Sequence, residues 1–305
     1  MGKIAFVFAG QGAQYPGMGQ ALAQASGAAA RVFDQADELR PGTSQQCFQG
    51  TEEELRETKN TQPCMFAVEM AAAAALEEAG IRADMAAGFS LGEIAALTYT
   101  QAVNFADGFR LVRRRGELMQ EAAEAQPTAM AAVLRLSNQA VEEVCAGFSQ
   151  AYPVNYNCPG QVSVACRQED LKDLSAAVKA AGGRALPLKV RGGFHSPFMA
   201  SASQGFAQVL EDCTLAEPAI PLYSNCTGQV YEGDSKDLLA RQIASPVRWQ
   251  TIVENMIAAG ADTFVEIGPG RTLCGLIEKI SKEVRTFSLD SLEDLERIKE
   301  EVKGC

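Results

Sequence analysis

Short apolar runs alternate with stretches of helical periodicity along most of the chain, and this alternation restricts the fold more than any other feature. Apolar runs at 4–9, 83–88 and 263–267 have the length of buried strands, and helical patterns cover 65–79 and 273–280. Strands that alternate with helices in this way are typical of a parallel sheet with helices packed on its faces. The sequence therefore predicts an α/β fold built on a parallel sheet.

The middle of the chain has a different order of elements. We expect a strand, a helix, a hairpin of two strands, a second helix and a last strand, at 130–136, 139–148, 154–157, 161–166, 169–181 and 185–190. This βαββαβ order is typical of a ferredoxin-like unit. We therefore predict a small ferredoxin-like subdomain over 127–191, inserted into a large subdomain made of 1–126 and 192–305.

Charge and composition exclude several classes of protein. The net charge of −11 does not suit a nucleic-acid binder that relies on a basic surface. No apolar run approaches the ~20 residues of a membrane span. The nine cysteines include no Cys-x-x-Cys pair, and free thiols fit a reducing compartment. We expect a cytoplasmic protein with neither a membrane nor a nucleic acid as partner.

A candidate nucleophile lies in the segment 88–92, which reads Gly-Phe-Ser-Leu-Gly. This is the Gly-x-Ser-x-Gly spacing of a nucleophile elbow, and the expected strand before it and helix after it fit that motif. The turn would leave the Ser90 hydroxyl at a helix N-terminus, where the backbone N–H of Leu91 can face a developing oxyanion. The alternative is a tight turn in which the serine only caps the helix.

The chain has one histidine, His195. Zinc sites built from several histidines are therefore excluded, and any imidazole chemistry must pass through this residue. It follows a glycine pair, Gly192-Gly193, at the predicted junction of the two subdomains. A serine is a weak nucleophile until a base takes its proton, so we expect His195 to be the partner of Ser90 rather than a structural histidine.

Arg115 is centred on the apolar stripe of a predicted helix, with apolar residues three and four positions away on both sides. A buried cation at such a position is costly unless an anion meets it. One explanation is a structural ion pair with an acid such as Glu93. The other is a bidentate clamp on a substrate carboxylate.

Gln11 follows the first expected strand, between Gly10 and Gly12. The segment is neither a dinucleotide fingerprint nor a phosphate-binding loop, because Tyr15 replaces the third glycine and no Gly-Lys-Ser/Thr follows. The carboxyl end of a strand is where α/β sheets bind their ligands. The Gln11 backbone N–H is therefore a candidate second oxyanion donor.

Taken together, these segments resemble the malonyl-CoA:acyl carrier protein transacylase family of fatty acid synthesis and the related acyltransferase domains of polyketide synthases. The resemblance runs nearly end to end. It is carried by Gly10-Gln11-Gly12-Ala13-Gln14-Tyr15-Pro16-Gly17-Met18-Gly19, Ser90-Leu91-Gly92-Glu93, Arg115-Gly116, Asn155-Tyr156-Asn157-Cys158-Pro159-Gly160-Gln161, Phe194-His195-Ser196-Pro197, Pro246-Val247-Arg248-Trp249 and Glu266-Ile267-Gly268-Pro269-Gly270.

The resemblance implies a fold and a set of roles. The body would be α/β-hydrolase-like with a ferredoxin-like insert. Ser90 would be acylated, with His195 as base and then acid. The backbone N–H groups of Gln11 and Leu91 would form the oxyanion hole, and Arg115 would hold the malonyl carboxylate. The backbone carbonyl of Gln242 would orient the histidine. Asn157 would lie near the pocket.

The implied reaction is a ping-pong transfer of malonyl from coenzyme A to the phosphopantetheine thiol of acyl carrier protein. Its partners are malonyl-CoA, which is a substrate, and the carrier protein; no cofactor or metal is implied, and we expect a monomer. Phe194 resembles the malonyl-selecting residue of polyketide acyltransferases, because its ring leaves little room for a methyl branch. A chain of this length without a ketosynthase segment favours fatty acid synthesis.

One position departs from the family, which usually has histidine where this chain has Phe89. That position does not supply the base, so we expect the chemistry to survive. Two alternative functions remain at this point. A serine thioesterase or hydrolase would use the same serine and histidine with an added acid, for which Asp170 and Asp173 are candidates. A non-catalytic acyl-CoA-binding protein has only Phe89 in its favour.

Docking of an acidic carrier protein to a chain of negative net charge would need a local basic patch. The candidates are Lys189, Arg191, Arg113 and Arg114. A scattered solvated surface is the alternative reading of these four residues.

Overall fold

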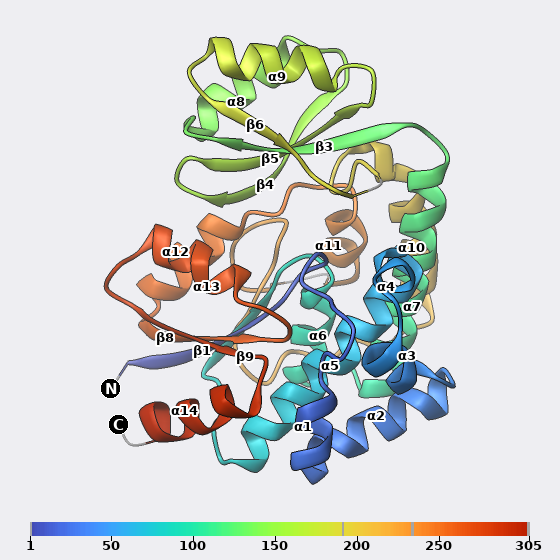
Figure 1. The fold of residues 1–305 in the computed structure, drawn as a ribbon, viewed down its shortest axis with the longest axis vertical. Coiled ribbons are helices and arrows are strands. Elements are labelled where there is room, and N and C mark those ends of the chain that lie inside the picture. Colours follow the sequence, from blue (N-terminus) through green and yellow to red (C-terminus); the bar gives the residue numbers. More distant parts are fainter. Residues whose placement is uncertain (1, 191, 233–234, 304–305) are drawn as a thin grey trace.

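The computed structural model describes residues 2–190, 192–232 and 235–303. Figure 1 shows a larger body below and a smaller unit above it, each with a sheet of its own. The sheet of the body has the order β7-β2-β1-β8-β9, and every neighbouring pair in it is parallel. Its strands are β1 (Lys3–Phe8), β2 (Met85–Gly88), β7 (Leu222–Tyr223), β8 (Ala261–Ile267) and β9 (Arg285–Leu289). The predicted α/β fold with a parallel sheet is confirmed.

Both faces of this sheet are buried, as the continuous apolar run of β1 predicts. Phe6 and Phe8 pack into the larger hydrophobic cluster with helices on one face. Ala5 and Val7 point to the opposite face, into a cluster with residues of α12 and α13. Because successive side chains of a strand alternate between faces, a strand between two helical layers must be apolar at every position.

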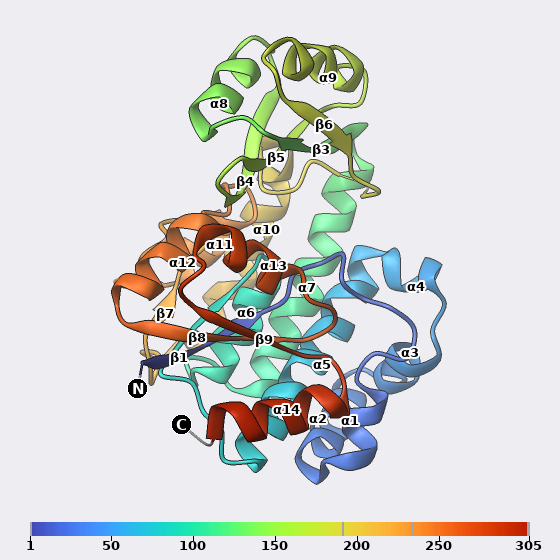
Figure 2. The same ribbon diagram turned by 60° about the vertical axis from the view of Figure 1, so that its left-hand side comes forward.

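The helices of the body enclose the sheet (Figures 1 and 2). They are α1 (Gln20–Ala25), α2 (Gly27–Leu39), α3 (Thr43–Gln49), α4 (Glu52–Arg56), α5 (Thr58–Glu78), α6 (Gly92–Tyr99), α7 (Phe105–Glu124), the short 3-10 helix η1 (Pro197–Met199), α10 (Ala200–Glu211), α11 (Ser235–Gln242), α12 (Trp249–Ala258), α13 (Thr272–Ile280) and α14 (Leu292–Lys303). Within the described residues, no helix is both long enough and apolar enough to span a bilayer.

The upper unit has an antiparallel sheet of order β4-β5-β3-β6. Its elements follow the predicted order: β3 (Thr128–Leu134), α8 (Asn138–Ala146), β4 (Ala151–Cys158), β5 (Gln161–Arg167), α9 (Leu171–Ala180) and β6 (Arg184–Pro187). Figure 1 shows α8 and α9 on the face of this sheet that points away from the body. The opposite face is therefore turned towards the carboxyl ends of the parallel strands.

One predicted boundary differs markedly from the structure. The helix predicted at 65–79 begins at Thr58, so that Pro63 lies inside α5. Proline lacks the N–H that would bond to the carbonyl four residues earlier, and it therefore usually marks a helix start. Here burial compensates, because Thr61, Gln62 and Pro63 are all buried against the rest of the body. The earlier start places Gln62 on a helix that faces the candidate site.

Candidate active site

Ser90 lies in a sharp turn between the end of β2 and the start of α6, with a backbone φ of 55°. Left-handed φ values are uncommon for residues other than glycine and mark a special turn. Two glycines make the turn possible. A Cβ atom on Gly88 would lie 2.0 Å from the backbone of Gly92, and one on Gly92 would lie 2.4 Å from the carbonyl oxygens of Phe8 and Ala9. The Gly-x-Ser-x-Gly spacing is therefore a steric requirement of the strand–turn–helix packing.

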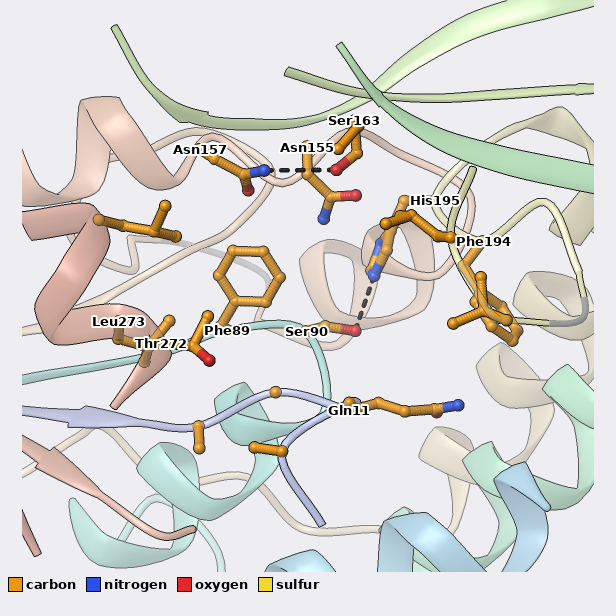
Figure 3. Close-up of a pocket in the computed structure, with 18 of the residues that line it drawn as sticks. Gln11, Phe89, Ser90, Asn155, Asn157, Ser163, Phe194, His195, Thr272 and Leu273 are labelled. Atoms are coloured by element: carbon orange, nitrogen blue, oxygen red, sulfur yellow. Dashed lines mark hydrogen bonds between the residues drawn. The ribbon is translucent and has the colours of Figure 1, made fainter. Parts of the chain in front are cut away.

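His195 meets Ser90 across the site. Its Nε2 lies 2.7 Å from the Ser90 Oγ, as the dashed line in Figure 3 shows. The histidine is buried and also has a left-handed backbone, with φ 59°. The next residue, Ser196, accepts a hydrogen bond from the Phe198 N–H and caps η1. This capped turn holds the imidazole over the serine.

The tautomer of His195 follows from its second contact. Its Nδ1 lies 2.9 Å from the backbone carbonyl oxygen of Gln242. A carbonyl oxygen can only accept a hydrogen bond, so the proton is on Nδ1 and the Nε2 lone pair faces Ser90. Burial, followed by the positive charge of Arg115, lowers the pKa of His195 to about 4. At neutral pH the imidazole is thus uncharged and able to take the serine proton.

Arg115 reaches the same hydroxyl from α7. Its Nη2 donates to the Ser90 Oγ at 3.2 Å and to the Gln242 Oε1 at 2.7 Å, and its Nη1 donates to the Gln62 Oε1 at 3.0 Å. The guanidinium is buried, and burial lowers its pKa to about 10, so the group stays charged. No carboxylate within 4 Å of it is found among the described residues, and its Nε has no hydrogen-bond partner there.

The ion pair between Arg115 and Glu93, one of the two explanations that the sequence left open for Arg115, does not form directly. The side-chain amide of Gln242 lies between the two groups, donating to the Glu93 Oε2 at 2.7 Å and accepting from Arg115. A fully buried guanidinium whose neighbours are neutral acceptors is a site for an anion. This arrangement fits a clamp for a substrate carboxylate better than a structural ion pair.

Two backbone amides near Ser90 are free to bind an oxyanion. Leu91 is the residue before α6, and Gln11 lies in the loop after β1, which passes beside Ser90 in Figure 3. Neither amide donates a hydrogen bond to another residue in the part of the chain that the structure describes. The Gln11 side chain is turned aside, with its Nε2 3.4 Å from the Thr58 Oγ1.

A cavity of about 290 Å³ adjoins Ser90 and His195 and lies between the two sheets. It is lined from below by the loops after β1 and β2, the end of β8 and α13, at the sheet edge where α/β folds bind ligands. Residues of β3, β4 and β5 line it from above. Phe194 and Asn157 are both buried in its wall. The Asn157 Nδ2 donates to the Ser163 Oγ at 3.3 Å, while its Oδ1 has no partner among the described residues.

Phe89 also lines this cavity. Its ring packs edge-to-face on Trp249, with centroids 5.4 Å apart, and lies in the cavity drawn in Figure 3. The side chain thus shapes the cavity, while the hydrogen bond between His195 and Ser90 forms without it.

The sequence analysis gave no role in the site to three further residues that the structure places there. Gln62 contacts Arg115 from α5, and Asn225 follows the two-residue strand β7. The Asn225 Oδ1 accepts from the Ser90 N–H at 2.8 Å, and its Nδ2 donates to the Gly88 carbonyl at 2.6 Å. The third is Glu93, which the sequence suggested only as an ion-pair partner. Its contacts join residues far apart in the chain, which spacing within a motif cannot reveal.

The acids required by a hydrolase triad lie elsewhere. Asp170 precedes α9 and Asp173 lies in its first turn, on the outer side of the upper unit in Figure 1. The orienting contact of His195 is instead the Gln242 carbonyl. Among the described residues, no group of three or more histidine, cysteine, aspartate or glutamate side chains could hold a metal ion.

The proposed basic patch is dispersed. Arg113 and Arg114 line a second hollow between α7 and α10, which also contains Asp107 and Asp212. Arg114 pairs with Glu117. Lys189 is exposed in the segment after β6, and Arg191 lies outside the described residues.

Comparisons with known proteins agree with this site. The model of the acyl transferase domain family matches residues 5–298. The malonyl CoA-acyl carrier protein transacylase of Bacillus subtilis is 38% identical over 304 residues, which cover 97% of this chain and 96% of the relative. The crystal structure of the transacylase of that name from Clostridium perfringens has a TM-score of 0.96 at 34% identity and covers 99% of this chain and 98% of that one.

A second solved structure is a type II PKS acyl-carrier protein in complex with its malonyl-transacylase. It has a TM-score of 0.94 at 35% identity and covers 98% of this chain and 99% of that one. The resemblance stated from the sequence motifs is confirmed over nearly the whole length. This chain belongs to the acyl transferase domain family.

Proposed function

We propose that this protein transfers a malonyl group from coenzyme A to the phosphopantetheine thiol of acyl carrier protein, through a malonyl ester of Ser90, and so supplies fatty acid chain elongation. The observation that carries the proposal is that His195 and Arg115 both contact the hydroxyl of Ser90. The Ser90 Oγ lies 2.7 Å from a neutral imidazole and 3.2 Å from a buried guanidinium. A nucleophile, its base and an acyl-carboxylate clamp thus meet at one atom.

In the first half-reaction, the Ser90 Oγ attacks the thioester carbonyl carbon of malonyl-CoA while its proton passes to the His195 Nε2. The backbone N–H groups of Gln11 and Leu91 bind the oxyanion that develops. When the carbon–sulfur bond breaks, the coenzyme A thiolate takes the proton from His195. The product is malonyl-Ser90 with a neutral imidazole.

The second half-reaction uses the same groups in reverse order. The phosphopantetheine thiol of the carrier protein gives its proton to His195, and its sulfur attacks the ester carbonyl. The carbon–oxygen bond then breaks, and Ser90 recovers its proton from the imidazolium. The Gln242 carbonyl keeps the Nδ1 proton in place throughout, so that only Nε2 exchanges protons.

Arg115 and Phe194 select the acyl group. A carboxylate on the acyl chain satisfies the buried guanidinium, whereas an uncharged acyl group leaves it without an anion, at a cost of a few kcal/mol. The Phe194 ring occupies the cavity wall where a methyl branch would have to fit. Asn157 lies in the same wall, where its Oδ1 has no partner among the described residues and is open to a substrate donor.

The architecture fits this assignment. The parallel sheet with its serine turn supports an α/β-hydrolase-like body over 1–126 and 192–305. The antiparallel order β4-β5-β3-β6 with two helices on one face supports a ferredoxin-like subdomain over 127–191. We further propose a cytoplasmic monomer whose chemistry requires no cofactor, because serine, histidine and arginine supply every step.

Intact-protein mass after brief mixing with malonyl-CoA tests the function, with Ser90→Ala as control. A malonyl adduct on the wild type alone, discharged by phosphopantetheinylated carrier protein, is the expected result. An adduct that water discharges equally fast would instead make the protein a thioesterase. The absence of any adduct would leave an acyl-CoA-binding protein without activity.

A further inference from the structure

Glu93, in the first turn of α6, has a fully buried carboxylate and lies three residues after Ser90. Its Oε1 accepts from the Asn225 backbone N–H at 2.9 Å and from the Tyr231 hydroxyl at 2.8 Å, and its Oε2 accepts from the Gln242 Nε2 at 2.7 Å. An ionised carboxylate only accepts hydrogen bonds, and all three partners are donors. None of the steps described above uses this group.

The Gln242 side chain is held in one orientation by a hydrogen-bond donor at its oxygen and by two acceptors at its nitrogen. Its Oε1 accepts from the Arg115 Nη2 at 2.7 Å, and its Nε2 donates both to Glu93 and to the Ser90 carbonyl oxygen, at 2.7 Å each. Rotation of the amide by half a turn would place its NH₂ group against the guanidinium and its oxygen against two acceptors. The carboxylate and the cation therefore fix the amide together.

Gln242 also belongs to the catalytic pair through its main chain, because its backbone carbonyl accepts the His195 Nδ1 proton. A second path runs through Asn225, whose backbone N–H is bound by Glu93 and whose side chain holds the Ser90 N–H. Both paths begin at the same carboxylate. One ends at the base and the clamp, and the other ends at the nucleophile.

From these contacts we propose that Glu93 is a positioning residue for acyl transfer, which sets Arg115 and His195 through Gln242 and sets Ser90 through Asn225. This role rests on the proposed transferase function and deepens it. Glu93 touches none of the reacting atoms. It acts by holding the nucleophile, its base and the carboxylate clamp in fixed positions relative to one another. Such fixed positions let the reacting groups meet in a productive geometry.

Replacement of Glu93 by glutamine tests this role because the variant keeps the shape but changes one acceptor into a donor. If the new NH₂ group faces Gln242, that amide must turn, and Arg115 loses its acceptor. If it faces the other side, it opposes the Asn225 N–H, which cannot become an acceptor. At least one of the two paths is therefore broken in either orientation.

The measurement is single-turnover acylation by malonyl-CoA, followed by rapid quenching and intact-protein mass. The amplitude gives the fraction of protein with a usable Ser90, and the rate constant per acylated serine is independent of how much protein is folded. We expect Glu93→Gln to lower this rate constant about 100-fold. Acetyl-CoA, which does not use the clamp, should also lose rate with this variant, because His195 and Ser90 are affected as well.

Glu69→Gln is the matched control. Glu69 is equally buried, in α5, and its carboxylate has no hydrogen-bond partner among the described residues. The same substitution there replaces a buried carboxyl group without touching the two paths. Its rate constant should stay within about twofold of the wild type.

Gln242→Ala tests the path through Gln242 separately, and it can be measured even if Glu93→Gln fails to fold. It removes the link but keeps the backbone carbonyl, so it should lower the rate constant at least as much as Glu93→Gln. Adding Glu93→Gln to it should change the rate by no more than about twofold if Glu93 acts chiefly through Gln242.

A wild-type rate per acylated serine in Glu93→Gln would overturn this role, as would a wild-type rate in Gln242→Ala. Full additivity of the two substitutions would overturn the path through Gln242 and leave only the path through Asn225. A wild type that takes up no malonyl group is a different result, because it overturns the proposed transferase itself.

Discussion

The His195 imidazole is oriented by a main-chain oxygen, with its Nδ1 2.9 Å from the carbonyl of Gln242. A carbonyl fixes the tautomer but carries no charge to stabilise an imidazolium. The positive charge of Arg115 opposes protonation of His195 and is the second cause, after burial, of the low pKa of that histidine. A malonyl carboxylate on Arg115 would cancel that opposition. The charged substrate thus improves the base that acts on it.

Arg115→Ala should therefore separate charged from uncharged donors. We expect kcat/KM for acylation by malonyl-CoA to fall about 100-fold or more, because a buried charge pair with the substrate is lost. Acylation by acetyl-CoA should change much less, since it makes no such pair. Arg110→Ala, an exposed residue of the same helix paired with Asp107, is the control and should match the wild type. Equal losses with both donors would refute the clamp.

The pH dependence of acylation should follow Glu93. Burial raises the pKa of Glu93 to about 7, against the lowering effects of its hydrogen bonds and of Arg115. Its other titratable neighbours, Tyr231 and Cys226, stay neutral here because burial raises both of their pKa values. A protonated Glu93 can no longer accept all of its hydrogen bonds, so the rate of acylation should fall as the pH drops through 7.

In Glu93→Gln this acid limb should disappear, leaving a slower reaction whose rate falls only as His195 is protonated, near pH 4. Rate constants for acylation measured from pH 4 to 9 in both proteins check this. An acid limb near pH 7 that persists in the variant would assign it to another group.

Gly92→Ala should destabilise the fold itself. The new Cβ atom would lie 2.4 Å from the carbonyl oxygens of Phe8, at the end of β1, and of Ala9, and the backbone must move to relieve the clash. We expect the free energy of unfolding to fall by about 3 kcal/mol. Gly275→Ala is the control, because a Cβ atom at that position of α13 would have no atom within 4 Å apart from its chain neighbours and the backbone of its own helix. It should instead raise the free energy of unfolding by about 0.5–1 kcal/mol. Urea denaturation of both variants provides the measurement.

Phe194→Ser should widen the acyl end of the cavity. Phe194 lies in the cavity wall near Met119 and Met130. Removal of the ring leaves space for a methyl branch, and we expect kcat/KM for methylmalonyl-CoA relative to malonyl-CoA to rise about tenfold. Competition between the two donors, read as the ratio of adduct masses on Ser90, gives this number directly. An unchanged ratio would show that another residue excludes the branch.

Glu69 should make the stability of the protein depend on pH. Burial without a partner raises its pKa well above the usual value, so the folded state keeps a proton that the unfolded state loses above about pH 4.5. By linkage, this group lowers the free energy of unfolding as the pH rises above that value.

Glu69→Gln removes this dependence. We expect the variant to be more stable than the wild type at pH 8, by roughly 1.4 kcal/mol for each unit of the shift, and to show almost no gain at pH 4. Denaturation curves at the two pH values make the comparison. A gain of equal size at both would point to packing rather than ionisation.

The sequence predicted the layered fold because apolar runs of strand length, such as 4–9, alternate with stretches of helical periodicity. It predicted the reactive pair because the serine turn has a fixed spacing and the chain has a single histidine. The short helices α3 and α4, of seven and five residues, were not predicted, because fewer than two turns leave no measurable period.

The residues that orient the catalytic side chains were harder to predict from the sequence. Asn225 reaches Ser90 over a separation of 135 residues, and Gln62 reaches Arg115 over 53. Such contacts depend on how helices and loops pack in three dimensions. The helix predicted at 65–79 starts too late, because α5 begins at Thr58 and Pro63 lies inside it.

The pair at the centre of the site is separated by 105 residues, and the whole upper unit lies between its members. A chain emerging from the ribosome therefore exposes Ser90 long before His195 exists, and Gln242 comes later still. Until then the hydroxyl has no base and no oriented acceptor. A growing chain thus cannot consume acyl thioesters before the segment that carries Gln242 has been made and has folded onto the body.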